Sequence, residues 1–262
     1  MTIKNADLSV RALLEIDRNI DQLVKEIELL SYVNPVNIKE AKERFFRSKY
    51  LTDPEFIYPQ IDFDRFRLHR ELFTQPLERI EDVETRQLYE DIIYTYSGLI
   101  QCIETIGSGR KFYYNCLHCF GTPTETDVEN AKFILHFEDR DLEQERFIPK
   151  YTSVETEPFF EAYSNQYDFN YRIEHSSKIS ASAMVLNNKR ALIVIENYLF
   201  SELELNVLNN HEIGVHMVTT MNGLEHPLKI FSHGVPNYEV TQEGLAVFAE
   251  YMSNNLTVTR LK

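Results

Sequence analysis

Two histidines and a glutamate stand close together in the segment His211-Glu212-Ile213-Gly214-Val215-His216. Neutral imidazole nitrogens are frequent zinc ligands, and a carboxylate beside a metal-bound water can accept its proton. The pattern H-E-x-x-x-H therefore predicts a metallohydrolase site, with His211 and His216 as ligands and Glu212 as the general base. The competing interpretation is that both histidines are hydrogen-bonded core residues of a helix.

The spacing of the two histidines makes a specific demand on the backbone. Residues five apart diverge by roughly 140° on an α-helix, from about 100° per residue, so an ordinary helix does not aim both rings at one ion. A π-type turn with i→i+5 hydrogen bonds corrects this divergence and often occurs at functional sites. Gly214 lies inside the motif and lets the backbone deform at low cost. We therefore predict a local π-type turn between His211 and His216.

A second helix is expected at Thr241–Tyr251, with Gln242-Glu243-Gly244-Leu245-Ala246 near its start. Where one helix supplies two histidines, a glutamate on a later helix is the usual third ligand, so Glu243 is our candidate. Its alternative role is that of a first-turn acid favoured by the helix dipole. Glu250 lies two turns further along the same face and is the rival ligand, although a solvated surface acid is the simpler interpretation of it.

These motifs, in this order and at this distance, resemble the QEGLA-motif family. That family includes microtubule-associated tyrosine carboxypeptidases and bacterial proteins labelled as flavohaemoglobin expression-modulating. The resemblance rests on H-E-I-G-x-H at 211–216, N-G at 222–223, H-P-L at 226–228 and T-Q-E-G-L-A-V-F at 241–248. It covers residues 172–252 and extends toward the segment 53–123.

The resemblance implies a zinc site in which His211, His216 and Glu243 are the ligands and Glu212 is the catalytic base. It also implies an α+β fold, that of a mostly helical zincin-like metallopeptidase with a small antiparallel β-sheet beside the HExxxH helix. The chain has Val215 where family members usually have threonine, and His226 where they usually have glutamine. Members usually continue well past the QEGLA helix, so we expect a catalytic lobe shortened or truncated at its C-terminus.

The flanks of the first motif predict the elements that position it. Ser201 and Glu204 form an S-x-x-E capping box, and Asn222-Gly223 is a stop signal, so a helix is expected over about 202–221. Residues 179–185 alternate with period two and 191–195 are apolar, which predicts a β-hairpin that turns at Asn187-Asn188.

Zinc peptidases commonly hold an extended substrate on an edge strand beside the active-site helix. Ser182, Ala183 and Met184 are our candidates for such an edge, where main-chain hydrogen bonds would bind the peptide. The alternative is a sheet that only supports the helix.

Peptide hydrolysis also needs a hydrogen-bond donor for the oxyanion and, in a carboxypeptidase, a group that binds the terminal carboxylate. A tetrahedral oxyanion needs a donor, for which Tyr238 is the first choice and His233 the second, because both precede the third ligand in the chain. Packed surface aromatics are the alternative for both. A carboxypeptidase must also bind a terminal carboxylate, and Arg172 and Lys178 are the candidates.

The domain organisation follows from the change in periodicity along the chain. Apolar residues at helical spacing predict helices over about 13–30, 38–48, 65–73 and 86–106, and a short helix over 127–137. We therefore expect a helical N-terminal lobe at 1–125 and the zincin-like catalytic lobe at 126–262.

Composition limits the classes of function. The chain has 262 residues, 43% of them hydrophobic, and a formal net charge of −14, which disfavours a nucleic-acid partner. No apolar run approaches the roughly 20 residues of a membrane span, and the N-terminus lacks a signal-peptide pattern, so no membrane association and a cytoplasmic location are expected. Three cysteines, including the pair Cys116 and Cys119, are expected to be reduced and partly buried rather than a zinc or redox site.

The sequence therefore predicts a zinc-dependent peptide hydrolase, carboxypeptidase-like, that acts on a peptide or protein C-terminus. One alternative is a catalytically inactive metal-binding protein with a regulatory or scaffold role. Another is a helical interaction module in which the histidines are structural. Metal content distinguishes the interaction module from the two metal-binding hypotheses. Glu212→Gln distinguishes the hydrolase from the inactive metal-binding protein.

Overall fold

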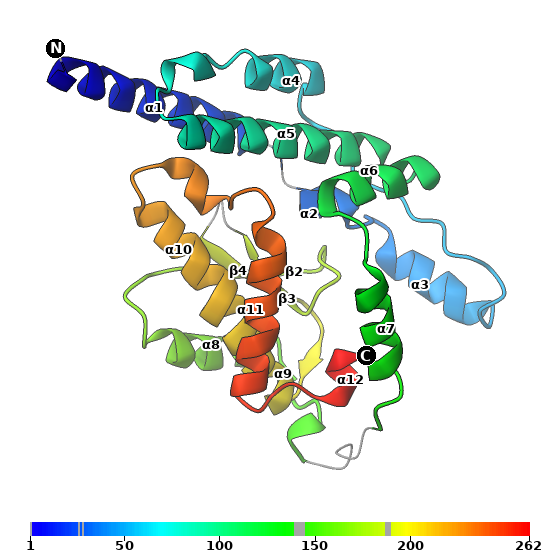
Figure 1. Ribbon diagram of the computed structural model, residues 1–262. Helices are drawn as coiled ribbons and strands as arrows, with labels where there is room; N and C mark the ends of the chain where they lie inside the picture. Colours follow the sequence, from blue (N-terminus) through cyan, green and yellow to red (C-terminus); the bar gives the residue numbers. More distant parts are fainter. Residues whose placement is uncertain (1, 26, 28, 139–144, 187–189) are drawn as a thin grey trace. The chain divides into compact units, whose positions relative to one another are not determined.

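The computed structural model describes residues 2–25, 27, 29–138, 145–186 and 190–262. These residues form two compact units (Figure 1). Unit 1 contains residues 1–121 and 226–231, and unit 2 contains residues 122–225 and 232–262. Most of the described chain is helical, with a small amount of strand, which confirms the expected α+β class. None of the described helices is both long enough and apolar enough to cross a membrane.

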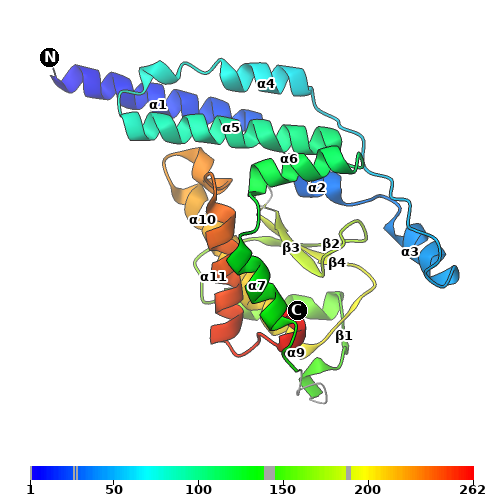
Figure 2. The same ribbon diagram turned by 45° about the vertical axis from the view of Figure 1, so that its right-hand side comes forward.

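Unit 1 is built from helices. They are α1 (Thr2–Val24), α2 (Leu29–Val33), α3 (Ile38–Arg47), α4 (Arg65–Phe73), the 3-10 turn η1 (Leu77–Arg79), α5 (Val83–Thr105) and α6 (Arg110–Phe120). The long helices α1 and α5 lie side by side in both views (Figures 1 and 2). Their buried faces carry Ile16 and Ile20 of α1 and Ile92 and Ile100 of α5, which belong to one apolar core.

The buried carboxylate of Asp17 connects distant parts of unit 1. It accepts a hydrogen bond from the Tyr89 hydroxyl at 2.8 Å and others from the backbone N–H groups of Lys229 and Ile230 at 2.6 and 3.2 Å. The segment 226–231 therefore belongs to the helical unit in space, although it lies inside the sequence range expected for the catalytic lobe.

Sequence periodicity located most of the helices of unit 1 but not all of their boundaries. The helix expected over 13–30 is interrupted, because α1 ends at Val24 and α2 begins at Leu29. The aromatic-rich segment after Gly109 forms α6, which the sequence analysis did not predict. Cys102 on α5 is buried, and its sulfur lies 3.4 Å from that of Cys119 on α6. All three cysteines are free thiols, and Cys116 and Cys119 are partly buried, as expected.

Unit 2 places a three-stranded sheet beside a long helical segment. Its first part consists of α7 (Glu125–Ile134), η2 (Glu145–Phe147), β1 (Tyr151–Thr152), η3 (Val154–Thr156) and α8 (Glu157–Ser164). The strands β2 (Arg172–Ser176), β3 (Ala183–Leu186), β4 (Ala191–Ile195) and β5 (Leu199–Phe200) follow. The remaining elements are α9 (Glu202–Leu208), η5 (Asn209–Met217), α10 (Val218–Glu225), α11 (Tyr238–Met252) and α12 (Val258–Leu261). The 3-10 turn η6 (Lys229–Ser232) comes between α10 and α11 in the sequence, and all of it except Ser232 belongs to unit 1.

The sheet is mixed rather than purely antiparallel. Its strand order is β2-β4-β3, and Figure 2 shows the three strands side by side. β3 and β4 are antiparallel, as the predicted hairpin requires, and Met184 pairs with Ile193. β2 adds to the other side of β4 in parallel, which the sequence analysis did not foresee. The hairpin turn expected at Asn187-Asn188 lies outside the described residues.

The core of unit 2 lies between the sheet and the helical segment. Central strand β4 is buried along Ala191–Val194, as is usual for a strand covered on both faces. Leu192 and Val194 pack with Leu205 of α9, Ile213 of η5 and Met217 of η5 in one cluster. The sheet thus fixes the position of the segment that carries the H-E-x-x-x-H motif, and β3 packs directly against η5.

Candidate metal centre

The motif histidines lie on a π-helix. α9 begins at Ser201, whose side chain accepts a hydrogen bond from the backbone N–H of Glu204, so this half of the predicted capping box forms. The helix continues through η5, in which residues 209–217 have π-type hydrogen bonds, and then through α10. The predicted π-type turn is confirmed and is longer than a single turn. An i→i+5 ladder brings residues five apart onto one face.

Gly214 fits the π-helix for a steric reason. A Cβ at this position would lie 2.9 Å from the hydroxyl oxygen of Tyr163 and 3.4 Å from the carbonyl oxygen of Asn209. Tyr163 belongs to α8, and its hydroxyl donates a hydrogen bond to Asn210 at 3.2 Å. Any larger residue at 214 would collide with α8, so glycine lets the motif segment pack closely behind the histidines.

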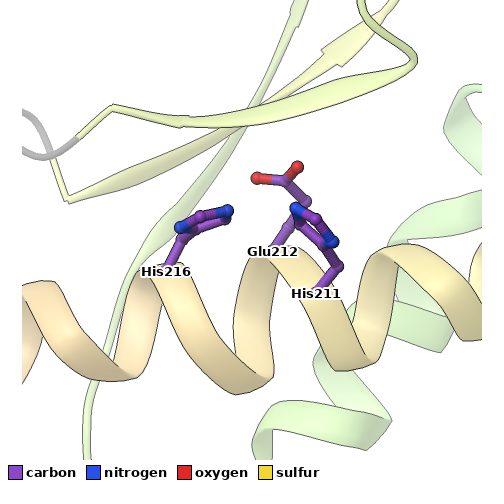
Figure 3. Close-up of side chains that lie close together, drawn as sticks. All are labelled: His211, Glu212 and His216. Atoms are coloured by element: carbon purple, nitrogen blue, oxygen red, sulfur yellow. The ribbon is translucent and has the colours of Figure 1, made fainter. Parts of the chain in front are cut away.

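The side chains of His211, Glu212 and His216 converge above the π-helix, on the side that faces the sheet (Figure 3). Each offers a ligand atom within 4.8 Å of the others. The two imidazole ring centroids are 4.8 Å apart, and the rings are inclined at 60°. Among the residues that the structure describes, this is the only group of three or more histidine, cysteine or acidic side chains close enough to hold a metal ion.

Glu243 completes the cluster from a second helix, α11, which packs against η5. One carboxylate oxygen of Glu243 lies 3.6 Å from Nε2 of His211, and the other lies 3.6 Å from Nε2 of His216. Two ligands of one tetrahedral zinc ion, each at 2.0–2.1 Å, are separated by about 3.4 Å. The observed separations of the two histidines from Glu243 therefore fit a zinc ion that all three share.

The ionisation of the cluster favours a cation. Burial raises the pKa of Glu212 to about 8; the charges of Glu243 and Glu250 add to this rise, whereas the backbone N–H of Val185 and the charge of Arg260 oppose it. Burial lowers the pKa of His216, so its ring is neutral at pH 7, as a metal ligand must be. A divalent cation among these groups would favour the charged carboxylates.

Glu250 is not the solvated surface acid that the sequence suggested. Its side chain is fully buried and accepts a hydrogen bond from Nδ1 of His211 at 2.7 Å. The Arg260 guanidinium donates to both of its oxygens, at 2.9 and 3.0 Å. Burial alone would raise the pKa of Glu250, but the hydrogen bonds from Arg260 and His211 outweigh it and hold the pKa below its usual value. Glu250 contacts the ring nitrogen of His211 that is not directed at Glu243.

Tyr238, the first choice for an oxyanion donor, is the first residue of α11. Burial raises its pKa, and the charges of Glu239 and Glu243 add to the shift, so its hydroxyl keeps its proton at neutral pH. Its ring lies against Gly234, where a Cβ would lie 2.2 Å from the ring and where φ is +94°. The second choice, His233, is partly buried in the turn after η6.

The candidate edge residues lie where β3 meets η5. β4 pairs with one side of β3, and no described strand pairs with its other side. The carbonyl of Ser182 accepts a hydrogen bond from the N–H of Ile195 on the β4 side. In an antiparallel pair every second residue directs its N–H and C=O groups at the partner strand, so Met184 also directs these groups at β4. The N–H and C=O groups of Ala183 and Val185 point the opposite way, and the N–H of Val185 binds Glu212. The free edge of β3 is thus directed at the cluster.

Ser182 also has a structural role at this edge. Its hydroxyl donates to the Glu204 carboxylate at 2.7 Å, so Glu204 reaches the sheet instead of closing the predicted capping box. Arg172 begins β2, on the far side of β4 from the edge strand, and its exposed guanidinium lies 3.6 Å from Glu174. Lys178 is exposed in the loop after β2. The group of side chains that converges at the motif consists of His211, Glu212 and His216 and includes neither of these two residues.

Three further residues contact the side chains of the site but were not predicted from the sequence to be functional. Arg260 lies on the short helix α12, and its only sequence signal is the N-cap Thr257, whose hydroxyl oxygen accepts from the N–H of Arg260. Val185 contributes a backbone group and therefore has no side-chain signal. Gln242, whose side chain hydrogen-bonds His216, is part of the second motif but was not assigned a role.

The fold and the site together define an α+β protein in which two helices gather histidines and carboxylates beside a strand edge, a set of ligand types used by metallohydrolases. The chain belongs to the microtubule-associated tyrosine carboxypeptidase family, whose family model matches residues 43–262. This confirms the resemblance drawn from the two motifs and assigns the chain to a carboxypeptidase family. The comparisons with curated proteins and with solved structures give no match.

Proposed function

We propose that this protein is a zinc-dependent carboxypeptidase with a zincin-like site, which removes a residue from the C-terminus of a peptide or protein. The observation that carries the proposal is the placement of the Glu243 carboxylate 3.6 Å from Nε2 of both motif histidines, in a chain of a tyrosine carboxypeptidase family. The family description suggests a terminal tyrosine and a microtubule protein as the substrate.

The donor set supports zinc as the metal. Imidazole nitrogens and a carboxylate suit zinc, and three protein ligands leave a fourth position for the reaction. His211, His216 and Glu243 would hold the ion. Glu212, Glu243 and Glu250 bring three carboxylates to the region, against the single guanidinium of Arg260. A divalent cation would favour the charged form of Glu212, whose pKa burial raises to about 8, and would offset the negative charge that results.

Glu212 is the proposed general base. When bound, zinc would polarise the scissile carbonyl and lower the pKa of a water molecule. Glu212 lies beside both histidines, with its carboxylate on the side that faces the sheet (Figure 3). The N–H of Val185 donates a hydrogen bond to this carboxylate. It would accept the proton of the attacking water and deliver it to the leaving amine. Tyr238 is the proposed donor to the oxyanion, because its hydroxyl stays protonated and lies near Glu243.

The edge of β3 is the proposed platform for the substrate main chain. Ala183 directs its N–H and C=O groups away from β4, and the C=O of Val185 points the same way. An extended peptide that pairs with this edge would pass directly over Glu212. Ser182 would fix the start of the strand through Glu204, and Met184 would present its side chain to the peptide. Arg172 and Lys178 stay predictions for the binding of the terminal carboxylate.

The test of this proposal separates metal binding from chemistry. Glu212→Gln keeps the size of the side chain and removes the base, so the protein should retain zinc and lose about 10²–10⁴-fold in hydrolysis of a peptide that ends in tyrosine. The matched variant Glu243→Gln should lose both zinc and hydrolysis. Unchanged turnover by Glu212→Gln would show that the base is wrongly assigned. A wild-type protein that binds zinc and cleaves no peptide would favour the regulatory alternative.

A further inference from the structure

The Glu250 carboxylate lies behind the proposed metal site and makes three strong hydrogen bonds. Nδ1 of His211 lies 2.7 Å from Oε1, and the Arg260 guanidinium lies 2.9 Å from Oε1 and 3.0 Å from Oε2. The Glu250 side chain is completely buried, whereas that of Arg260 is 47% exposed. A buried carboxylate on a helix that also carries a proposed ligand is costly unless it is paired. Its position therefore requires a physical explanation.

The pairing determines which tautomer His211 adopts. The guanidinium of Arg260 only donates, so the Glu250 carboxylate is an anion whose oxygens only accept. Nδ1 of His211 must then carry a proton, which in the neutral ring leaves the lone pair on Nε2. Nε2 is the nitrogen that lies 3.6 Å from Glu243. The pairing thus fixes the orientation of the His211 ring and the tautomer of its neutral form, with Nε2 facing the other proposed ligands.

Arg260 reaches Glu250 because the chain turns back after α11. The backbone carbonyl of Glu250 accepts hydrogen bonds from the N–H groups of Asn255 and Leu256, at 2.9 and 3.1 Å. Thr257 then caps α12, and the third residue beyond this cap is Arg260. Glu250 therefore holds the turn by its main chain and the guanidinium by its side chain. This arrangement brings the last helix of the chain to the histidine cluster.

We propose that Glu250 and Arg260 are positioning residues of the metal site: Arg260 fixes the carboxylate of Glu250, and Glu250 fixes the tautomer and orientation of His211. This inference rests on the proposed zinc function. A carboxylate behind a metal-ligating histidine raises the basicity of the ligand, and its loss typically weakens metal binding by about 10–100-fold. Both residues would act through His211, because Glu250 contacts Nδ1 of that ring and Arg260 contacts Glu250.

The first test measures zinc affinity by competition with a chromophoric chelator. Glu250→Gln keeps the shape of the side chain and should weaken zinc binding by about 10–100-fold. Arg260→Gln should weaken it less, and the double variant should bind no more weakly than Glu250→Gln alone, because both act through one contact. Glu225→Gln, an exposed acid at the end of α10, is the matched control and should bind zinc as the wild type does.

The outcomes separate this inference from the proposed function. If the wild type and Glu225→Gln bind zinc and Glu250→Gln binds it equally tightly, the positioning role is wrong and the zinc site stands. If the wild type binds no zinc, both proposals are wrong. Should Glu250→Gln fail to fold, Arg260→Gln carries the same test, since its side chain is partly exposed.

The second test needs no metal. Nitrogen-15 NMR of the imidazole rings in the metal-free protein should show His211 protonated at Nδ1 and unprotonated at Nε2. In Arg260→Gln this preference should weaken, and in Glu225→Gln it should be unchanged. A purely structural role for Glu250 would change the unfolding temperature without changing the tautomer. Protonation of His211 at Nε2 in the wild type would contradict the inference.

Discussion

At the scale of single residues, the site depends on pairs that tie one element to another. Glu243 of α11 approaches both histidines of η5, and the N–H of Val185 on β3 holds Glu212. Behind the helix, Tyr163 of α8 occupies the space that a side chain at Gly214 would need. A Cβ at position 214 would lie 2.9 Å from the Tyr163 hydroxyl oxygen, so an added methyl group there should have a measurable effect.

Gly214→Ala should destabilise the protein by about 1–3 kcal/mol, because the added methyl group would displace the Tyr163 hydroxyl from Asn210. This cost exceeds the gain of up to about 1 kcal/mol that alanine brings to a helix. Urea unfolding measures the difference. Gly244→Ala is the matched control: apart from its chain neighbours and its own helix backbone, no atom lies within 4 Å of the added Cβ, so it should be neutral or stabilising. Equal effects of the two substitutions would contradict the steric explanation.

The backbone conformation of the first motif could be predicted from the sequence because the spacing of its histidines has a geometric consequence. Five-residue spacing and an internal glycine required a π-type helix, and the structure has one over Asn209–Met217. The same reasoning misjudged Glu250, whose burial depends on Arg260. No local pattern relates these two residues, because a turn of the backbone after α11 brings them together. Side-chain pairs of this kind depend on the tertiary structure and cannot be predicted from local sequence patterns.

At the scale of elements, helix ends and strand edges decide how the site is assembled. Ser201 starts the helix that carries the histidines, and β3 presents its open side to that helix. Hydrophobic periodicity predicted α4 and α11 closely, since both have an apolar stripe. It missed α8 and also α6, which carries several exposed aromatic residues. It could not predict the parallel pairing of β2, because strand order depends on long-range packing.

Helix α5 should contribute a pH dependence through its N-cap. Asp82 accepts hydrogen bonds from the hydroxyl and the N–H of Thr85, which lower its pKa. Because the folded pKa is depressed, this stabilisation is present above about pH 4 and is lost as the pH falls through the lower folded value. Carboxyl NMR titration should give Asp82 a pKa below its usual value. In Asp82→Asn, unfolding free energy should fall less steeply below pH 4; an identical slope would contradict this role.

At the scale of the whole molecule, long-range contacts decide which segments belong together. Asp17 joins α1 to α5 and to the segment 226–231, which is more than 200 residues away in sequence. That segment follows α10 and precedes α11, so the chain leaves unit 2 and returns to it between η5, which carries the two histidines, and α11, which carries Glu243. The sequence showed Asp17 only as one of several charged residues on an amphipathic helix.

Asp17→Asn should lower the free energy of unfolding by about 1–3 kcal/mol, because an amide nitrogen would face a backbone N–H in a buried position. Asp91→Asn is the control, since Asp91 is exposed and its carboxylate accepts a hydrogen bond from the Gln87 side chain at 2.9 Å. Its effect should stay within about 0.5 kcal/mol. Urea unfolding of both variants distinguishes a buried network from a general effect of charge.

Zinc should stabilise the folded chain as a whole. A ligand that binds only the native state at 100 times its dissociation constant adds about 2.7 kcal/mol, so added zinc should raise the unfolding temperature and a chelator should lower it. Glu243→Gln should remove this response, while Glu225→Gln should keep it. A zinc-induced shift that persists in Glu243→Gln would place the metal elsewhere.

The most direct test of the whole account is the metal content of protein purified without added metal. Elemental analysis should find one zinc ion per chain in the wild type and in Glu212→Gln, and none in His216→Gln or Glu243→Gln. A wild-type protein that carries no stoichiometric zinc and takes none up, or a Glu243→Gln variant that keeps the full amount, would contradict the claim that two histidines of a π-helix and a glutamate of α11 share one ion.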